Sequence, residues 1–289
     1  MRTVVLTLGV AVVAGLLSAP ARSQRIGDAS PTNTLPNPYR TVEGYFKLPE
    51  GRTWGSTSAI EIDTDGRSVW VAERCGANSC RNSNLPPILE FDESGTLVRS
   101  FGAGMFVFPH GIFVDRDGNV WVTDGQDDAQ QPAAGAGPAA ATLFGPRPGA
   151  TTGHQVFKFS PDGTLLMTLG RRGGAADPDF FYQPNDVLVA PGGEIFVSEG
   201  HGGANARVLK FSRDGRLITS WGRKGSGPGE FNQPHALAMD TQGRLFVGDR
   251  GNNRIQIFNQ DGRFLAEWPQ FSRPSGIYID KRDVIYVAD

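Results

Sequence analysis

Two hairpin-forming units alternate along the chain, and this repetition limits the fold more than any other feature. The first unit is an apolar stretch, a turn and a second apolar stretch that ends beside an acidic residue, with copies at 59–74, 109–125, 184–200, 234–250 and 274–289. Copies of the second unit lie at 88–102, 156–170, 208–222 and 255–268. Alternating Val, Ile, Phe and Trp residues are typical of strands, and most of the turns between them hold Asp-Gly or Gly-Gly pairs. Each unit is therefore predicted to be a β-hairpin.

Two successive hairpins make a four-stranded antiparallel sheet whose period fits a propeller blade. Spacings of 75, 50 and 40 residues separate the prolines that open four leading hairpins, Pro109, Pro184, Pro234 and Pro274. A low-complexity insertion predicted over 126–153 accounts for the longest spacing. Units of ~40–50 residues are typical of blades, which stack radially to bury their faces. A sandwich or an up-and-down barrel does not explain a repeated pair of unequal hairpins, so an all-β propeller is predicted.

The copies amount to about four and a half blades. Four pairs are complete, and one leading hairpin ends at Asp289. The segment 41–49 (TVEGYFKLP) is predicted to add a closing or outer strand. A chain that ends midway through a repeat leaves the edge of its last strand unpaired, and such an edge favours aggregation. We therefore expect a C-terminally truncated sequence whose full-length form has six blades.

The N-terminal segment is predicted to direct export. A positively charged start, an apolar run over 4–17 and an Ala-Pro-Ala site are typical of a secretory signal peptide over 1–21. The uncleaved anchor is the alternative, although the run is short for a membrane span. Residues 22–42 are predicted to be a flexible tether and 43–289 the propeller. The mature protein is expected to be secreted or periplasmic, with no membrane span.

The net charge bears on the classes of binding partner, and the cysteine content bears on disulfide formation. The formal net charge of −2 lacks the excess of positive charge that is typical of nucleic-acid-binding proteins. Cys75 and Cys80 are the only cysteines. In an exported protein they could close a small disulfide loop, and two free thiols are the alternative. The oligomeric state is not indicated.

Two of the four histidines occupy one repeat position in two different blades. His110 and His235 each follow the leading proline, in FPHGI and QPHAL. Equivalent positions on different blades point toward the central channel, and neutral imidazole suits zinc. Packing at the mouths of the blades is the alternative. The pair predicts a metal site on the axis.

The order of motifs resembles the peptidyl-α-hydroxyglycine α-amidating lyases among the NHL-repeat propellers. The similarity runs from about residue 60 to 268 and is dense in MFVFPHGIFVDRDGNVWVTDG, GHQVFKFS, IFVSEG and FNQPHALAM. This resemblance implies an NHL-type β-propeller that cleaves peptidyl-α-hydroxyglycine to a peptide amide and glyoxylate. A small peptide or an N-acyl hydroxyglycine would be the substrate.

The resemblance also implies roles for particular residues. His110 and His235 match two zinc ligands of the family, and the third lies in a last blade that the sequence lacks; Ser275 is at the repeat position of an earlier blade. Arg74 matches a catalytic arginine that would hold the carboxylate or the developing oxyanion. The backbone carbonyl of Ile112 matches a ligand of a structural calcium ion. His154 matches a family histidine that is not a metal ligand, and we interpret it as structural.

One departure from the family pattern concerns the catalytic tyrosine. His201, in VSEGHGG, stands where that tyrosine is expected. This histidine could act as the base, could replace the missing zinc ligand, or could mark the loss of lyase activity. The three alternatives stay open at the level of sequence.

Three functions compete on these observations. A zinc-dependent lyase explains the two histidines together with Arg74. A non-catalytic NHL propeller that binds proteins or ligands explains the repeats equally well. A calcium-dependent hydrolase such as a lactonase would use acidic and amide side chains around the axis, for which Asn185 and Asp186 are the candidates.

Overall fold

The computed structural model describes residues 24–25, 38–129, 147, 149–174, 181–201 and 205–289. The predicted signal peptide and most of the predicted tether and inserted loop lie outside these residues. Within them, the chain forms strands and one 3-10 helix, η1 (Arg250–Asn252). No helix among the described residues is long and apolar enough to cross a membrane.

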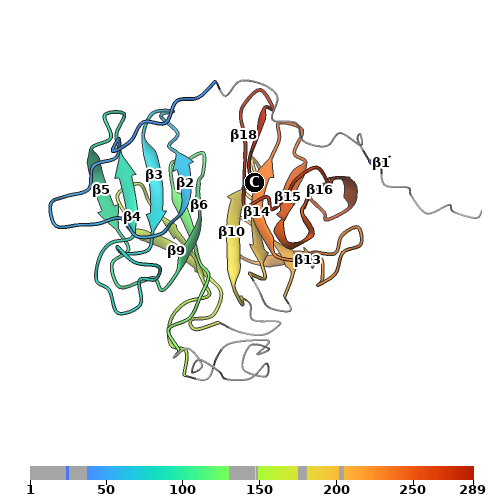
Figure 1. Ribbon diagram of the computed structural model, residues 1–289. Helices are drawn as coiled ribbons and strands as arrows, with labels where there is room; N and C mark the ends of the chain where they lie inside the picture. The colour runs from blue at the N-terminus through green and yellow to red at the C-terminus, as the bar shows by residue number, and fades with distance from the viewer. Residues whose placement is uncertain (1–23, 26–37, 130–146, 148, 175–180, 202–204) are drawn as a thin grey trace, which may run out of the picture.

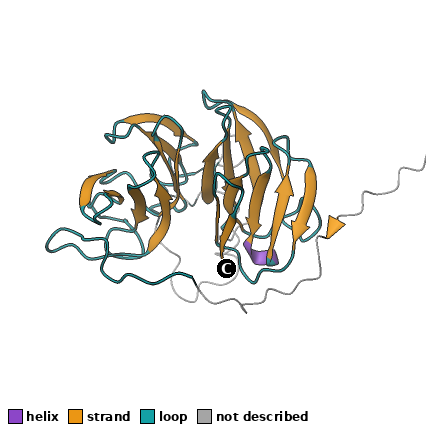
Figure 2. Cartoon of the chain, turned by 90° about the horizontal axis from the view of Figure 1, so that it is seen from above, coloured by secondary structure: helices purple, strands orange, loops and turns teal. Residues whose placement is uncertain are grey.

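Four blades of four antiparallel strands each are arranged about a common axis, and the sheet of the fourth blade gains a fifth, parallel strand (Figures 1 and 2). The first blade contains β2 (Thr57–Ile62), β3 (Val69–Glu73), β4 (Ile88–Phe91) and β5 (Leu97–Phe101). The second contains β6 (Pro109–Val114), β7 (Val120–Asp124), β8 (Val156–Phe159) and β9 (Leu165–Leu169).

The third and fourth blades repeat the same order. The third contains β10 (Pro184–Val189), β11 (Ile195–Glu199), β12 (Arg207–Phe211) and β13 (Leu217–Trp221). The fourth contains β14 (Pro234–Met239), β15 (Leu245–Asp249), β16 (Arg254–Phe258) and β17 (Phe264–Trp268). A fifth leading hairpin, β18 (Gly276–Ile279) with β19 (Ile285–Ala288), follows. The predicted NHL-type β-propeller, with about four and a half blades, is confirmed.

Apolar layers between neighbouring blades form the core. The first two blades share a cluster around Trp70, Ile88, Val122 and Phe159, whose side chains are all fully buried. The innermost strands β2, β6, β10, β14 and β18 contact one another in that order around the axis. One face of each sheet is therefore buried against the next blade, as the radial stacking of propeller blades requires.

Acidic residues at the hairpin turns explain why the same turn recurs. Asp115 Oδ1 accepts hydrogen bonds from the backbone N–H groups of Asp117 and Asn119, at 3.0 and 2.9 Å. Asp240 makes the same two bonds in the fourth blade. Gly118 has a φ of 78°, which only glycine adopts without strain. The recurring turn aspartates are therefore structural.

The segments before the first blade contact the outer strands. Residues 41–49, predicted as a strand, form only an isolated bridge, in which Lys47 pairs with Thr96. The strand prediction was wrong in extent because the chain turns at Gly44, with a φ of 61°, and only Lys47 forms a bridge to the blade. Within the predicted tether, β1 (Gln24–Arg25) pairs in parallel with β17.

Candidate metal centre and its surroundings

Three histidine side chains from three blades meet at the mouth of the central channel. His110 comes from β6, His235 from β14 and His201 from the loop that follows β11. The ring centroids of His110 and His235 are 4.7 Å apart, and His201 lies 5.0 and 5.3 Å from them. One ligand nitrogen from each ring lies within 4.8 Å of the others, a spacing at which three imidazoles could hold one metal ion.

An irregularity at the start of each inner strand turns the histidines toward the axis. The pairing of β6 with β7 shifts between Pro109 and Ile112, and that of β14 with β15 shifts between Pro234 and Ala236. Such an extra residue interrupts the ladder and changes the direction of a side chain. His110 and His235 each lie inside the shift.

Acidic residues at the ends of the second strands hold the segments that lead to the histidines. Asp124 accepts backbone hydrogen bonds from Val107 and Phe108, and the bond to the N–H of Phe108 is 2.6 Å long. Asp249 accepts one from Asn232, also at 2.6 Å. These carboxylates therefore fix the backbone two to three residues before His110 and His235.

Backbone carbonyls of neighbouring blades set the tautomers of two imidazoles. His110 Nδ1 is 2.9 Å from the carbonyl oxygen of Asn185, and His235 Nδ1 is 2.8 Å from that of Ser275. A carbonyl only accepts, so each Nδ1 carries the proton and each neutral ring keeps a lone pair on Nε2. Metal-binding histidines are commonly held by such a second hydrogen bond.

The surroundings keep all three rings neutral. Burial lowers the pKa of His235 and of His201 to about 4, and the charge of Arg250 adds to both shifts. Burial and the two neighbouring histidines lower the pKa of His110 well below its ordinary value. Neutral imidazole is the form that binds a metal, so the donor set fits zinc at neutral pH.

Arg74 lies next to the cluster on a platform formed by Phe108. Its guanidinium carbon is 3.3 Å from the ring centroid of Phe108, and the ring of Phe108 stacks with that of His110 at 6.0 Å. Nε donates to the carbonyl of Pro109 at 3.3 Å, and Nη1 donates to Asn78 Oδ1 at 2.8 Å. Burial lowers the pKa of Arg74 to about 10, so the side chain stays charged at neutral pH.

Arg250 is a second cation at the cluster, and our sequence reasoning missed it. Its Nε is buried and has no hydrogen-bond partner among the described residues. The sequence did hold a signal, because Arg74 and Arg250 both directly follow the acidic residue that ends a second strand, Glu73 or Asp249. Two arginines whose charges act on these imidazoles give the site a positive field suited to an anionic ligand.

Below the histidines, the inner strands line a central cavity of about 560 Å³. Ile112, Asp186 and Glu61 lie in its wall. Ile112 is one of the lining residues, and the role of its carbonyl as a calcium ligand stays a prediction. Asn185 is fully buried and donates from Nδ2 to the carbonyl of Pro234, while Asp186 accepts from the backbone of Leu237. Both side chains therefore connect neighbouring blades.

Replacing Glu61 with glutamine is expected to stabilise the protein at alkaline pH. Burial and the charge of Asp186 raise the pKa of Glu61 to about 8. The folded state then holds a proton that the unfolded chain releases near pH 4.5, so the free energy of unfolding falls as the pH rises from 4.5 to 8. Each unit of pKa shift corresponds to about 1.4 kcal/mol. Glu61→Gln should therefore gain a few kcal/mol at pH 9 and little at pH 4, by urea unfolding.

The exposed Glu50 supplies the control for this comparison, because Glu50→Gln removes the same charge outside the cavity. Equal effects of the two substitutions at pH 9 would contradict the assignment of a raised pKa to Glu61.

His154, the fourth histidine, belongs to a different network. Its Nδ1 accepts the backbone N–H of Gln183 at 3.1 Å, and its Nε2 lies 3.1 Å from Asp127 Oδ2. Arg147 forms an ion pair with the same aspartate. The bridge between Asp127 and Gly153 closes the base of the predicted insertion. His154 therefore has a structural role, as our sequence interpretation held.

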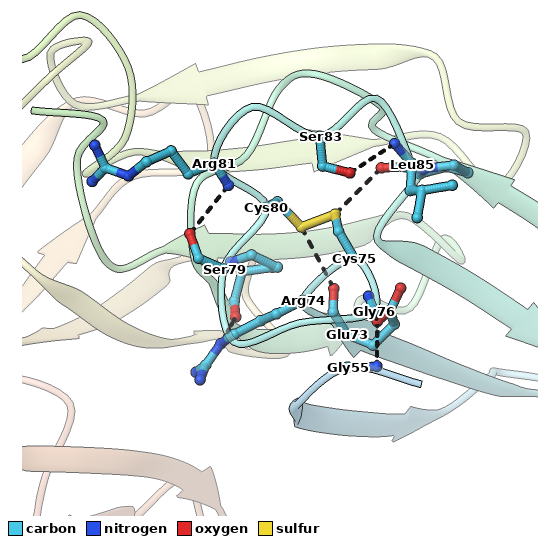
Figure 3. The surroundings of a disulfide bond; sticks show 12 residues. Gly55, Glu73, Arg74, Cys75, Gly76, Ser79, Cys80, Arg81, Ser83 and Leu85 are labelled. Carbon is cyan, nitrogen blue, oxygen red and sulfur yellow. Dashed lines mark hydrogen bonds between the residues drawn. A yellow bond between two sulfur atoms is a disulfide. The ribbon is translucent and has the colours of Figure 1, made fainter. Parts of the chain in front are cut away.

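Cys75 and Cys80 form a disulfide directly after Arg74 (Figure 3). Both sulfurs are largely buried, with 7% and 3% of each residue exposed. The bond closes a short loop that contains Asn78, the residue that accepts a hydrogen bond from Arg74.

Comparison with known proteins identifies relatives of two kinds. The NHL repeat family matches residues 231–258. NHL repeat-containing protein 3 of Homo sapiens is 34% identical over 237 residues, which cover 80% of this chain and 59% of the relative. Peptidyl-glycine alpha-amidating monooxygenase of Mus musculus is 37% identical over 258 residues, covering 78% of this chain and 24% of the relative. The chain thus spans less than two thirds of these curated relatives.

One further curated relative and one solved structure complete the comparison. Peptidyl-alpha-hydroxyglycine alpha-amidating lyase 1 of Drosophila melanogaster is 32% identical over 188 residues, covering 61% of this chain and 30% of the relative. A streptogramin B lyase structure superimposes with a TM-score of 0.54 at 17% identity, covering 84% of this chain and 64% of the other, a likeness that shows the fold alone. The chain is an NHL-repeat β-propeller, similar to the amidating lyases and to NHL repeat-containing protein 3.

Proposed function

We propose that the protein is a zinc-dependent carbon–nitrogen lyase that cleaves a peptidyl- or N-acyl-α-hydroxyglycine to an amide and glyoxylate. The observation that carries this proposal is the meeting of three neutral imidazoles, from His110, His201 and His235, beside two arginines. A pure scaffold has no need for such a set. The similarity to amidating lyases supports the choice of reaction.

The three imidazoles would hold the ion, with Nε2 lone pairs offered by His110 and His235. Zinc in this position would supply Lewis-acid polarisation of the substrate hydroxyl. His201 is proposed as the third ligand rather than as the base. Protonation of His201 is disfavoured by burial and by the charges of Arg250 and Arg74, so it is a weak proton acceptor at neutral pH.

The arginines would recognise the carboxylate of the substrate. Arg250 has a buried Nε without a partner, and the Arg74 guanidinium forms no ion pair with any residue in the described ranges. Planar guanidinium groups bind carboxylates with paired N–H donors. The hydroxyl loses its proton as the carbon–nitrogen bond breaks, the carbonyl of glyoxylate forms, and the amide nitrogen gains a proton. The reaction is balanced without a redox partner.

The test combines metal analysis with product analysis. The purified protein is expected to contain one zinc ion per chain and to release glyoxylate from α-hydroxyhippurate. Protein without zinc and without glyoxylate release would leave the alternative of a non-catalytic propeller. Zinc with no glyoxylate release would keep the metal centre and refute the lyase reaction.

Replacing Arg250 with alanine is expected to lower kcat/KM for α-hydroxyhippurate by about 10- to 100-fold. Hydrogen bonds to charged groups contribute about 1.5–3 kcal/mol, and 1.4 kcal/mol corresponds to a factor of ten. The zinc content should not change. The exposed Arg216 provides the control, since Arg216→Ala removes an arginine from the outer part of the third blade. Equal kinetics of Arg250→Ala and the unaltered protein would exclude Arg250 from substrate binding.

A further inference from the structure

Arg74 depends on its neighbours for its orientation, because it has no acidic partner. Among the described residues, the one other buried arginine, Arg254, is neutralised by two carboxylates, because it pairs with Asp249 and Glu267 at 2.9 and 2.8 Å. Arg74 instead uses a carbonyl, an aromatic ring and the amide oxygen of Asn78. Its positive charge is therefore kept free for an anion.

Asn78 is the one side chain that directs a guanidinium nitrogen of Arg74 among the hydrogen bonds of the described residues. Asn78 itself is exposed. A hydrogen bond from an exposed, freely rotating side chain contributes little, because ordering that side chain opposes it. Something else must therefore hold Asn78 in place.

The Cys75–Cys80 disulfide supplies this constraint. It closes the short loop that carries Asn78, directly after Arg74 (Figure 3). The loop is fixed at its end, where the backbone N–H of Cys80 and the hydroxyl of Ser79 both donate to the carbonyl of Val107, at 2.8 and 3.0 Å. At its start, the backbone N–H of Gly76 donates to Glu73 Oε2 at 3.0 Å.

We propose that the loop Cys75–Cys80 is a positioning device that, through Asn78, orients the Arg74 guanidinium toward the carboxylate of the substrate. This inference rests on the proposed function for the identity of the anion. Asn78 acts through Arg74 and touches no reacting atom, so it is a positioning residue. A neutral amide suits this role because an acidic side chain at the same place would neutralise the arginine.

The charge of residue 78 separates positioning from a merely structural role. Asn78→Ala should raise KM for α-hydroxyhippurate about 3- to 10-fold, less than the 10- to 100-fold effect expected for Arg250→Ala, because Asn78 acts only through Arg74 and is itself exposed. Asn78→Asp should raise KM further, because the new carboxylate competes with the substrate for Arg74. Zinc content and kcat should change little. Asn84→Asp is the control, because it adds the same charge outside the loop that the disulfide closes. It should leave KM unchanged.

A non-reacting ligand keeps this test separate from the proposed function. Hippurate carries the carboxylate but no hydroxyl, so its dissociation constant can be measured by calorimetry even if no glyoxylate is released. The order of affinity should be the unaltered protein, then Asn78→Ala, then Asn78→Asp. The double variant Cys75→Ser/Cys80→Ser should weaken hippurate binding to a similar extent as Asn78→Ala. An unchanged affinity in both Asn78 variants would overturn the inference, whatever the outcome for zinc and glyoxylate.

Discussion

His110→Ala should lose bound zinc and glyoxylate release together. The substitution removes one of three nitrogens that lie within 4.8 Å of one another. Mutating a residue that only hydrogen-bonds to a metal ligand typically lowers metal affinity or activity about 10- to 100-fold. Removing the ligand itself should therefore lower zinc affinity and activity by more than about a hundredfold. His235→Ala should give the same result, because both histidines would bind one ion. Zinc content is measured by elemental analysis after dialysis, and activity by glyoxylate release.

His154→Gln is the matched control for the two alanine variants. His154 is as buried as His110, but its two nitrogens bond to Asp127 and to the backbone of Gln183. A glutamine side chain can also donate and accept one hydrogen bond there. This variant should lose some stability and retain its zinc. Full zinc occupancy in His110→Ala would refute the assigned centre, whereas loss of zinc in all three variants would indicate general misfolding.

The repeat pattern predicted most of the fold because it depends on local rules. Alternation of apolar residues and turn glycines fixes each hairpin, and a fixed period requires blades that stack on one another. The same regularity placed His110 and His235 at equivalent positions and therefore on one axis. The segment 41–49 was predicted less well because it lies outside the repeats; its bridge joins Lys47 to Thr96 in the turn before β5, and Phe46 packs on Phe91.

The rest of the candidate site depends on irregular segments that a repeat does not encode. His201 follows Gly200, whose φ of 118° and close approach to Asn205 turn the loop, so its direction could not be derived from strand alternation. Arg250 lies in η1, a short helix at a position where the other blades have a loop. The sequence showed both residues, but only the folded backbone brings them to the axis.

His201→Ala should also lose zinc, and this result would distinguish a ligand from a base. As a third ligand, His201 contributes to affinity for the ion, so both zinc content and kcat should fall by at least about tenfold. As a base, it would affect proton transfer alone, so kcat would fall with zinc content unchanged. His201→Tyr provides the second comparison, because the resembling family carries a tyrosine at this place. Under our proposal the tyrosine variant binds zinc less tightly than the unaltered protein.

The pH dependence of zinc binding and activity independently distinguishes a zinc ligand from a base at His201. Burial, with Arg250 and Arg74 adding to it, lowers the pKa of His201 to about 4. Protonated imidazole cannot bind zinc, so protons compete with the metal for His201 only as the pH falls toward about 4. Zinc should therefore stay bound at pH 6.5, where a free imidazole is about half protonated. If His201 were instead a free base, the activity of His201→Tyr would require a pH nearer the ordinary pKa of tyrosine, about 10. A zinc-replete His201→Tyr protein whose activity rises only at such alkaline pH would therefore contradict the third-ligand assignment and identify His201 as the base.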